Sequence, residues 1–374
     1  MIKPRFLQIH SLNSYSASLL NRDDSGLAKR LLYGGTLRTR ISSQCLKRHW
    51  RMANDPHALN RITEAESSIR SRDLVTQMII NPLTDKFPKD VLEKLEPEIQ
   101  KAVYGEKGGS KKSRQTLLLG NPEIRWLKDE VEKIAEKAGD DPKQAEAIAK
   151  DWAKDFNKNI KIMREQTTLH AGLESALFGR MVTSDPNANI TAPVHVAHSF
   201  TIHSEETESD YFTAVDDLSE DQQGADTIQE TELTSGIFYG YTVVDIPSLL
   251  NNLGGDITLA GKVLYNLVYL IAEVSPGAKL GSTAPFSRAT LVLLEAGDRQ
   301  PRSLAEAYRK HCQPQISTAI TSLKNHLINL DEAYSTEEER RILSLENTDF
   351  PRAIHATLKE LGLWAKDLPN RVAK

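Results

Sequence analysis

Positively charged side chains at regular spacing make the segment from Tyr33 to Arg51 the strongest candidate for chemistry in this sequence. Arg38 and Arg40 alternate within a run that predicts a β-strand, so both side chains are expected on one face. Lys47 and Arg51 follow four residues apart, a spacing that places two side chains on one face of a helix. Cations at these positions could bind successive phosphate groups of a nucleic acid.

Helix-capping residues separate the two pairs of cations. Ser42 and Ser43 precede a predicted helix from Gln44 to about Met52, and serine is a favoured cap. The free amides and the dipole at such a helix start also favour an anion. A solvated basic face is the alternative interpretation. The absence of aspartate and glutamate from residue 25 to residue 53 favours phosphate binding.

A second basic stripe occurs at helical spacing further along the chain, at Lys150, Lys154, Lys158 and Lys161. Its functional interpretation is a sequence-independent contact with the backbone of duplex DNA. The favoured alternative is a solvated face, because Asp151, Asp155 and nearby glutamates dilute the positive charge.

Two aromatic residues, Tyr211 and Phe212, stand in an otherwise polar and acidic stretch. The default interpretation is that they pack onto the body of the protein. Alternatively, they form a wedge that enters between stacked bases, as aromatic and apolar side chains do in nucleic-acid complexes. Met181 could share that role or fill the core.

Signals for a metal site or for catalysis are weak in this sequence. His195, His198 and His203 lie close together, but no clustered carboxylate completes a ligand set, so we expect neither a metal nor a cofactor. Asp23 and Asp24 could ligate a metal or act as acid and base, although capping a turn and balancing a neighbouring arginine is the favoured role. The motifs GxSxG, HExxH and the Walker loop do not occur.

The overall charge of −4 over 374 residues hides two opposite blocks. Residues 1–51 contain ten lysines and arginines against two aspartates, whereas residues 204–233 contain eleven acidic side chains and no lysine or arginine. With 39% hydrophobic and 26% charged residues, the composition is that of a globular protein of two or three packed units. This composition excludes collagen-like and wholly disordered chains.

Cysteine usage and hydropathy predict a cytoplasmic protein. Only Cys45 and Cys312 are present, so no disulfide framework is expected. Residues 1–10 have no apolar stretch long enough for a signal peptide. The most apolar region, 263–274, is short and interrupted by polar residues, so no contact with a membrane is expected.

Strand patterns at both ends of the chain, with helices between them, predict an α+β core of ferredoxin-like type. Strands are expected at 4–11, 37–41, 194–202, 234–246, 289–294 and 341–345. A helical turn is expected around Leu27, Leu31 and Leu32, before Gly34-Gly35 breaks the chain. Helices are expected at 66–80, 88–104, 122–138 and 143–179, which form an all-helical insertion, and at 258–273, 303–330 and 351–363.

Eight short motifs occur in an order that resembles one known family. They are NRDD at 21–24, the paired glycines at 34–35, RISSQCLKR at 40–48, ESSIR at 66–70, GRM at 179–181, FTAVDDL at 212–218, SGIFYGY at 235–241 and PGAK at 276–279. Together they look like the CasC-type backbone subunit of the type I-E CRISPR Cascade complex. The motifs cover the chain from residue 21 to about residue 279.

The resemblance implies a fold shaped like a right hand, with an RRM-like (ferredoxin-like) palm, an all-helical fingers insertion and a β-hairpin thumb. The implied boundaries are palm at 1–55, 181–203 and 236–374, fingers at 56–180, and an acidic thumb hairpin at 204–235. It also implies a non-catalytic subunit that polymerises head to tail, in about six copies, along one CRISPR guide RNA together with other Cascade subunits. The guide would be kinked about every sixth nucleotide and presented for pairing with target DNA.

Particular site residues follow from the same resemblance. Met181 and Phe212 look like the pair that flanks the kinked nucleotide, and the lysine stripe resembles a fingers surface that meets DNA. Arg38 is added to the predicted RNA-binding residues because it shares a face of the predicted strand with Arg40. The residues that look like guide-RNA contacts on the palm are Arg22, Lys29, Arg40, Gln44, Lys47 and Arg51, with Lys279 in an RNA-facing loop.

Two other functions stay open on the sequence. An RNA-cleaving backbone subunit of a related CRISPR complex would use an aspartate such as Asp23 or Asp216. A basic-armed DNA-binding regulator would instead bind a duplex without guide RNA. For the leading function, we hypothesise that the acidic thumb is oriented by the basic palm of the adjacent copy, in part through Glu205, Glu206 and Glu208.

Overall fold

The computed structural model of the chain describes residues 3–105, 108, 110–182, 185–215 and 225–373. The chain forms two compact units. The sheet unit comprises Met1–Ala58, Val194–Pro247 and Ala260–Lys374, and the helical unit comprises Leu59–Pro193 and Ser248–Leu259. Within the described residues, no helix is both long and apolar enough to cross a membrane.

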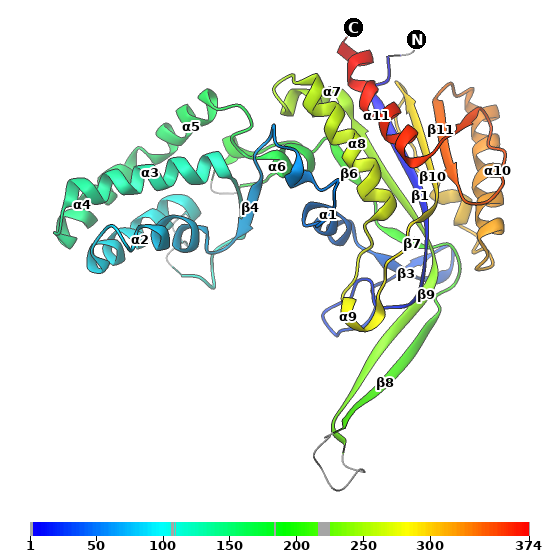
Figure 1. Cartoon of the computed structure of the whole chain (residues 1–374), viewed down its shortest axis with the longest axis horizontal. Coiled ribbons are helices and arrows are strands. Elements are labelled where there is room, and N and C mark those ends of the chain that lie inside the picture. Colours follow the sequence, from blue (N-terminus) through cyan, green and yellow to red (C-terminus); the bar gives the residue numbers. More distant parts are fainter. Residues whose placement is uncertain (1–2, 106–107, 109, 183–184, 216–224, 374) are drawn as a thin grey trace. The chain divides into compact units, whose positions relative to one another are not determined.

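One large sheet forms the centre of the sheet unit (Figure 1). Its strands run in the order β12-β11-β10-β1-β9-β7-β3-β2, and β6 and β8 also pair with β9. The β11–β12 pair is parallel, and the other pairs of this sheet are antiparallel. The strands are β1 (Phe6–Ser18), β2 (Arg30–Tyr33), β3 (Thr36–Ile41), β6 (Val194–Val196), β7 (Ser199–Thr201), β8 (Thr207–Val215), β9 (Ala225–Asp245), β10 (Ala289–Gly297), β11 (Glu339–Ser344) and β12 (Ala353–His355).

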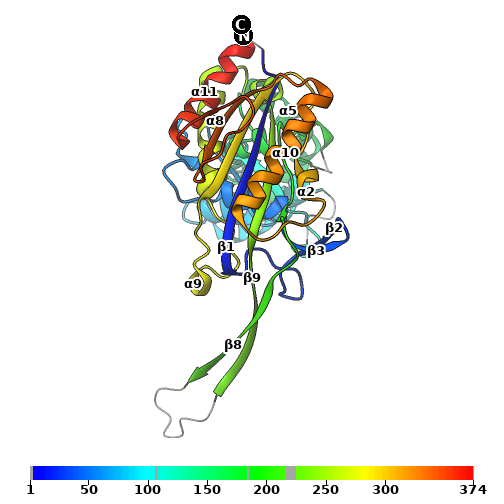
Figure 2. The same ribbon diagram turned by 90° about the vertical axis from the view of Figure 1, so that its right-hand side faces the viewer.

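Helices lie on both sides of this sheet, with α10 on one side and α8 and α11 on the other (Figure 2). Leu323 and Leu327 of α10 share a buried core with Leu12 of β1 and Leu291 of β10. Because both of its faces are covered, β1 is buried at every position from Phe6 to Leu12. The helices of this unit are α1 (Ser43–Arg51), α8 (Ile257–Glu273, from Ala260), α9 (Leu280–Thr283), α10 (Ile316–Tyr334) and α11 (Leu358–Ala373). The helix α7 (Ile246–Asn252) belongs to the helical unit from Ser248 onward.

The four middle strands have a simple connectivity. Along the chain they come in the order β1, β7, β9, β10, but in the sheet they lie in the order β10-β1-β9-β7. The connection from β1 to β7 contains α1, and the connection from β9 to β10 contains α8. The predicted α+β fold is therefore confirmed as a mixed fold with a large, mostly antiparallel sheet.

A two-stranded ribbon extends from the sheet, formed by β8 and the first half of β9 (Figures 1 and 2). Its register runs from Thr207 opposite Thr234 to Val215 opposite Ala225. The second half of β9 pairs with β1 as far as Asp245, which lies opposite Phe6. One continuous strand therefore belongs both to the centre of the sheet and to the ribbon.

The predicted helical turn around residues 27–32 is wrong, because Leu31 and Leu32 belong to β2. A two-residue turn, Gly34-Gly35, joins β2 to β3, and both glycines have positive φ, +59° and +77°. This is the backbone that a tight hairpin requires, and it overrides the helix-like spacing of the leucines. A Cβ atom on Gly34 would also lie 1.7 Å from the carbonyl oxygen of Arg309, so that position has no room for a side chain.

The helical unit has a core of its own and is not all helical, contrary to the prediction. The predicted helices at 88–104 and 122–138 are confirmed as α2 and α3, but β4 and β5 pair antiparallel within the predicted insertion. Each strand has four residues, too few to show a strand period in the sequence. The elements are β4 (Ser68–Ser71), a π-helical stretch (Val75–Ile80), α2 (Lys89–Tyr104), β5 (Leu117–Gly120), α3 (Asn121–Ala138), α4 (Pro142–Lys154), α5 (Phe156–Gln166) and α6 (Leu173–Phe178).

Three other predicted elements have different bounds. The predicted strand 194–202 divides into β6 and β7, which flank His198. The helix predicted from residue 303 begins only at Ile316, after a 3-10 turn at Ala305–Tyr308. The predicted helix 351–363 is replaced by β12 and α11, and Thr357 and Glu360 cap the start of α11 by reciprocal hydrogen bonds.

Candidate nucleic-acid interface

The helix α1 begins as its sequence predicts. Ser42 is the N-cap, and its hydroxyl oxygen accepts a hydrogen bond from the amide of Cys45 at 3.2 Å. The amide of Ser42 donates to the Asn21 side chain at 2.9 Å, which ties the helix start to the loop after β1. Arg48 and Arg51 lie in the last turn, where cations complement the helix dipole.

His198 lies at the centre of a group of cations on the sheet unit. Its Nδ1 atom is 3.2 Å from Nη1 of Arg40 and 3.3 Å from the amide nitrogen of Ser43. Burial lowers the pKa of His198, and the charges of Arg40, Lys29 and Lys47 lower it further. We call Lys29, Arg40, Lys47 and His198 the basic cluster. After burial, the causes that lower this pKa are three neighbouring cations, so the charged groups around His198 are positive.

A tight loop places Lys29 in this cluster. Oδ1 of Asp23 accepts the amides of Ser25 at 2.9 Å and Leu27 at 3.0 Å, and the amide of Asp23 donates to the Leu27 carbonyl. The amide of Lys29 donates to the Asn21 carbonyl, and its own carbonyl accepts the amide of Arg40. The carboxylate of Asp23 therefore caps this turn, which is the favoured role in the sequence interpretation.

The other residues predicted to bind RNA on the palm lie on the same loop and the same helix as Lys29 and Lys47. Arg22 is exposed on the same loop, where it pairs through the backbone with Ala28. Gln44 is exposed in the first turn of α1, and Arg51 is partly exposed in its last turn. The structure thus brings together Lys29 from a loop, Arg40 from β3 and Lys47 from α1.

Arg38 is different, and its assignment to an accessible RNA surface is wrong. Its side chain is fully buried, with 0% exposure. The guanidinium donates to the carbonyl oxygens of Thr201 at 2.9 Å and Tyr308 at 3.1 Å, and it makes longer contacts with those of His203 and Arg309. Arg38 therefore holds the β7 end and the 3-10 turn together and presents no charge to a phosphate.

An arginine that the sequence interpretation missed fixes the base of the ribbon. Arg30 of β2 binds the carboxylates of both Glu205 and Glu232, and Glu232 also accepts the amide of Ala28. The two carboxylates are 11% and 13% exposed. We call these three charged residues the Arg30 anchor. Two of the acids in the negative block therefore share one arginine partner within the chain, and Glu205 is not free to meet an adjacent copy.

Loss of the Arg30 anchor is expected to loosen the ribbon base. In Arg30→Ala, two poorly exposed carboxylates lose their partner, which should lower the local opening free energy by about 1.5–3 kcal/mol. Hydrogen exchange at the amides of Ala28 and Leu233 would measure this loss. The control is Arg309→Ala, which removes an exposed pair with Glu306 and should change little. Equal exchange in both variants would contradict the anchoring role.

The base of the ribbon also holds Lys279. Its ammonium lies 5.4 Å from the ring centre of Phe212 and donates to the hydroxyl of Thr231. Phe212 is 42% exposed and Tyr211 is 62% exposed, so neither aromatic side chain is packed into a core. Lys279 thus contacts the ribbon of its own chain, and both aromatic rings remain accessible to a ligand.

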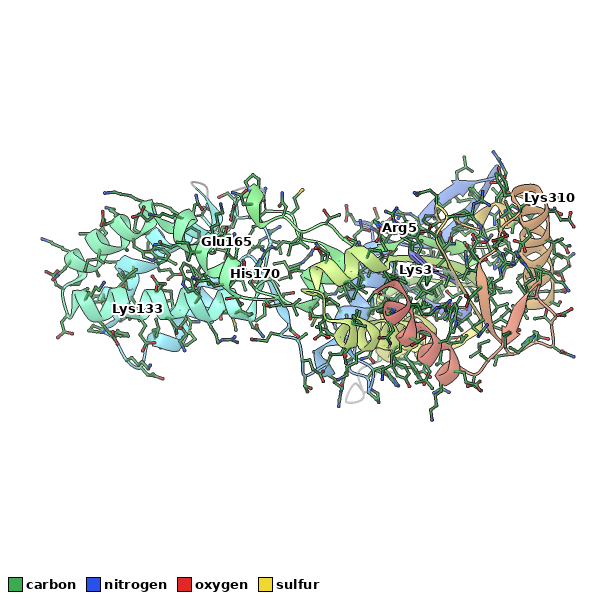
Figure 3. All side chains as sticks on the ribbon, turned by 90° about the horizontal axis from the view of Figure 1, so that it is seen from above. Lys3, Arg5, Lys133, Glu165, His170 and Lys310 are labelled. Carbon is green, nitrogen blue, oxygen red and sulfur yellow. The ribbon has the colours of Figure 1, made fainter. Side chains whose placement is uncertain are left out.

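In the helical unit, Met181 is accessible but the lysine stripe is mostly paired. Met181 is 79% exposed and follows Arg180, which is buried against Glu123 at 2.6 Å. The stripe is divided between α4 and α5, so it does not form one helix face. Lys150, Lys154 and Lys161 pair with Glu146, Asp151 and Glu165 at 2.5, 3.1 and 3.8 Å. These ion pairs favour the interpretation of the lysine stripe as a solvated face and not as a contact with DNA. Glu165, the partner of Lys161, is labelled in Figure 3.

The three histidines of the weak metal signal serve different purposes. His203 is buried, and its ring bonds the Ser204 carbonyl and the Ile237 amide. His195 is exposed on β6, and His198 belongs to the basic cluster. Among the described residues, no group of three or more histidine, cysteine, aspartate or glutamate side chains is arranged to hold a metal ion. Asp216 lies outside the described residues.

Fold and site together define a mixed α+β protein whose mostly antiparallel sheet carries a projecting ribbon and a partly exposed basic cluster. The chain belongs to the family of CT1975-like proteins (Cas_CT1975), whose model matches residues 7–365. No curated protein matches the sequence.

Two solved structures share the fold of this chain. One chain, from a structure described as "CRISPR RNA-guided surveillance complex, pre-nicking", is 24% identical, with a TM-score of 0.80 over 97% of this chain and 100% of that one. Another, from a "CRISPR RNA-guided surveillance complex", is 21% identical, with a TM-score of 0.59 over 96% of this chain and 98% of that one. At this level of identity, the similarity establishes the fold.

Proposed function

We propose that this protein is a guide-RNA-binding backbone subunit of a CRISPR surveillance complex. The observation that carries the proposal is the basic cluster, in which Lys29, Arg40 and Lys47 meet around an exposed histidine on the sheet unit. Cations from three elements suit the evenly spaced charges of an RNA backbone. The fold shared with chains of RNA-guided surveillance complexes supports the same conclusion.

The finer assignment is to the type I-E Cascade complex, with an RRM-like palm, a fingers insertion and a thumb. The order β10-β1-β9-β7 with two crossover helices supports the palm, and the ribbon corresponds to the thumb. In this assignment, about six copies assemble head to tail on one guide RNA with other Cascade subunits. Lys29, Arg40 and Lys47 bind the backbone of the guide, and base pairing reads the target DNA.

Accessible apolar side chains suit the proposed kinking of the guide about every sixth nucleotide. Phe212 and Met181 are both exposed, as wedges that unstack bases must be. Arg22, Gln44, Arg51 and Lys279 complete the proposed RNA-binding set. Arg38 is removed from it because its guanidinium is buried. The lysine stripe remains a proposal for DNA contact, weakened by its internal ion pairs.

Purification of the protein with its natural partners, followed by extraction of nucleic acid, tests the function. A discrete RNA of uniform length is expected. Recovery of duplex DNA, or of no nucleic acid, would contradict an RNA scaffold and favour a DNA regulator or another role. The assembled complex should also leave complementary RNA intact in the presence of Mg²⁺, whereas cleavage would favour the RNA-cleaving alternative.

A further inference from the structure

The ring of His198 is held in one orientation and one tautomer. Nη1 of Arg40 and the amide of Ser43 both donate toward Nδ1, at 3.2 and 3.3 Å. An arginine and a backbone amide are obligatory donors, so Nδ1 acts as an acceptor. The single proton of the neutral ring therefore lies on Nε2, on the side away from both donors.

The surroundings of His198 keep the ring neutral. Three charged groups act on the ring of His198. They are Lys29 from the loop before β2, Arg40 from β3 and Lys47 from α1. All three are cations, and with burial they lower the pKa of His198. A proton on Nδ1 would also turn that atom into a third hydrogen-bond donor, facing the donors of Arg40 and Ser43.

We propose that His198 binds a phosphate of the guide RNA as a neutral hydrogen-bond donor, through Nε2–H, beside the cations of the basic cluster. This inference rests on the proposed function and adds a residue to its site. Lys29, Arg40 and Lys47 supply the attraction for the anion, whereas the fixed Nε2–H supplies direction. The backbone amide of Ser43, at the start of α1, orients the ring by donating to Nδ1. The helix start therefore contributes to phosphate binding by fixing the direction of Nε2–H.

Two substitutions of His198 distinguish the role of the Nε2–H donor from that of the Nδ1 acceptor. His198→Gln can place an amide N–H near the position of Nε2, whereas His198→Asn can offer an oxygen near Nδ1 but has no donor that reaches as far. Binding of the full chain to a fluorescein-labelled single-stranded RNA would be measured by anisotropy over a series of NaCl concentrations. His355→Asn is the matched control, because His355 is exposed on β12 at the opposite end of the sheet order from β2.

The glutamine variant is expected to bind RNA nearly as well as the wild type, and the asparagine variant about ten-fold more weakly. The dependence of log affinity on log salt should be unchanged in both, because a neutral donor releases no counterions. By contrast, Lys47→Ala should reduce that slope by about one.

Several outcomes would overturn the inference. A slope reduced in the histidine variants would mean a cationic contact. An asparagine variant that binds like the wild type, or a glutamine variant weakened as much as asparagine, would mean that His198 does not act through Nε2–H. Failure of the wild-type protein to bind RNA would instead contradict the proposed function itself.

Discussion

Lys47→Glu is expected to abolish retention of guide RNA in the purified complex. Lys47 shares the basic cluster with Lys29 and Arg40, so an acidic side chain there both removes one phosphate contact and repels the RNA. In a head-to-tail assembly, the same loss is repeated in every copy along the guide. The salt dependence of RNA binding by the isolated subunit should also fall by about one phosphate contact or more.

The matched control is Lys310→Glu. Lys310 is exposed on the sheet unit, outside the basic cluster, and its reversal changes the net charge of the chain by the same amount (Figure 3). We expect RNA recovery close to that of the wild type. Equal losses in the two variants would show that net charge, and not the cluster, governs RNA binding.

Glu295→Gln is expected to destabilise the sheet unit more than any exposed substitution. Glu295 has a fully buried carboxylate that binds both terminal nitrogens of Arg302, at 2.7 and 2.9 Å, and Nε of Arg340 at 2.7 Å. It also accepts Nε2–H of His10 at 3.0 Å. The neutral amide removes the carboxylate partner of Arg302 and leaves Arg340 paired with Asp331 alone, for an expected loss of about 3–5 kcal/mol.

Hydrogen exchange at the amides of β10 would report this loss directly, because Glu295 lies in that strand. Glu306→Gln is the control, since its pair with Arg309 is exposed and should contribute about 0–1 kcal/mol. A change in Glu295→Gln as small as in Glu306→Gln would show that the network does not stabilise the fold. Glutamine nearly preserves the side-chain volume, so a cavity does not explain a large effect.

The same network predicts the response to acid. Burial alone would raise the pKa of Glu295, but hydrogen bonds from His10 and Arg302 hold it well below its ordinary value. Burial lowers the pKa of His10. Both groups therefore bind fewer protons in the folded state, so stability falls on acidification, first below about pH 6.5 and again below about pH 4.3.

Helix caps, helix faces and tight turns could be predicted from the sequence, because they depend on residues that are close together in the chain. Ser42 caps α1 as its type predicts, and the cations of that helix follow from their spacing. The Gly34-Gly35 pair also carried a hairpin signal, because paired glycines between two apolar runs favour a two-residue turn. Interpreting the leucines by their helical spacing gave that signal too little weight.

Long-range partners could not be read in the same way. Alternation places Arg38 and Arg40 on one side of β3, yet one is buried among carbonyls and the other meets His198. The difference comes from Tyr308, about 270 residues away, which no local pattern reveals. The Arg30 anchor has the same origin, because Glu205 precedes β8, Glu232 lies on β9 and the arginine lies on an edge strand.

The pairing of β8, which carries Phe212, with the continuous strand β9 limits how the length of this protein can change during evolution. Side chains alternate along a strand, so an insertion of one residue between the sheet and Phe212 would turn that ring to the opposite face, away from Lys279. An insertion of two residues restores the face and moves the ring outward by about 6.6 Å. Homologous chains should therefore differ in this stretch by even numbers of residues.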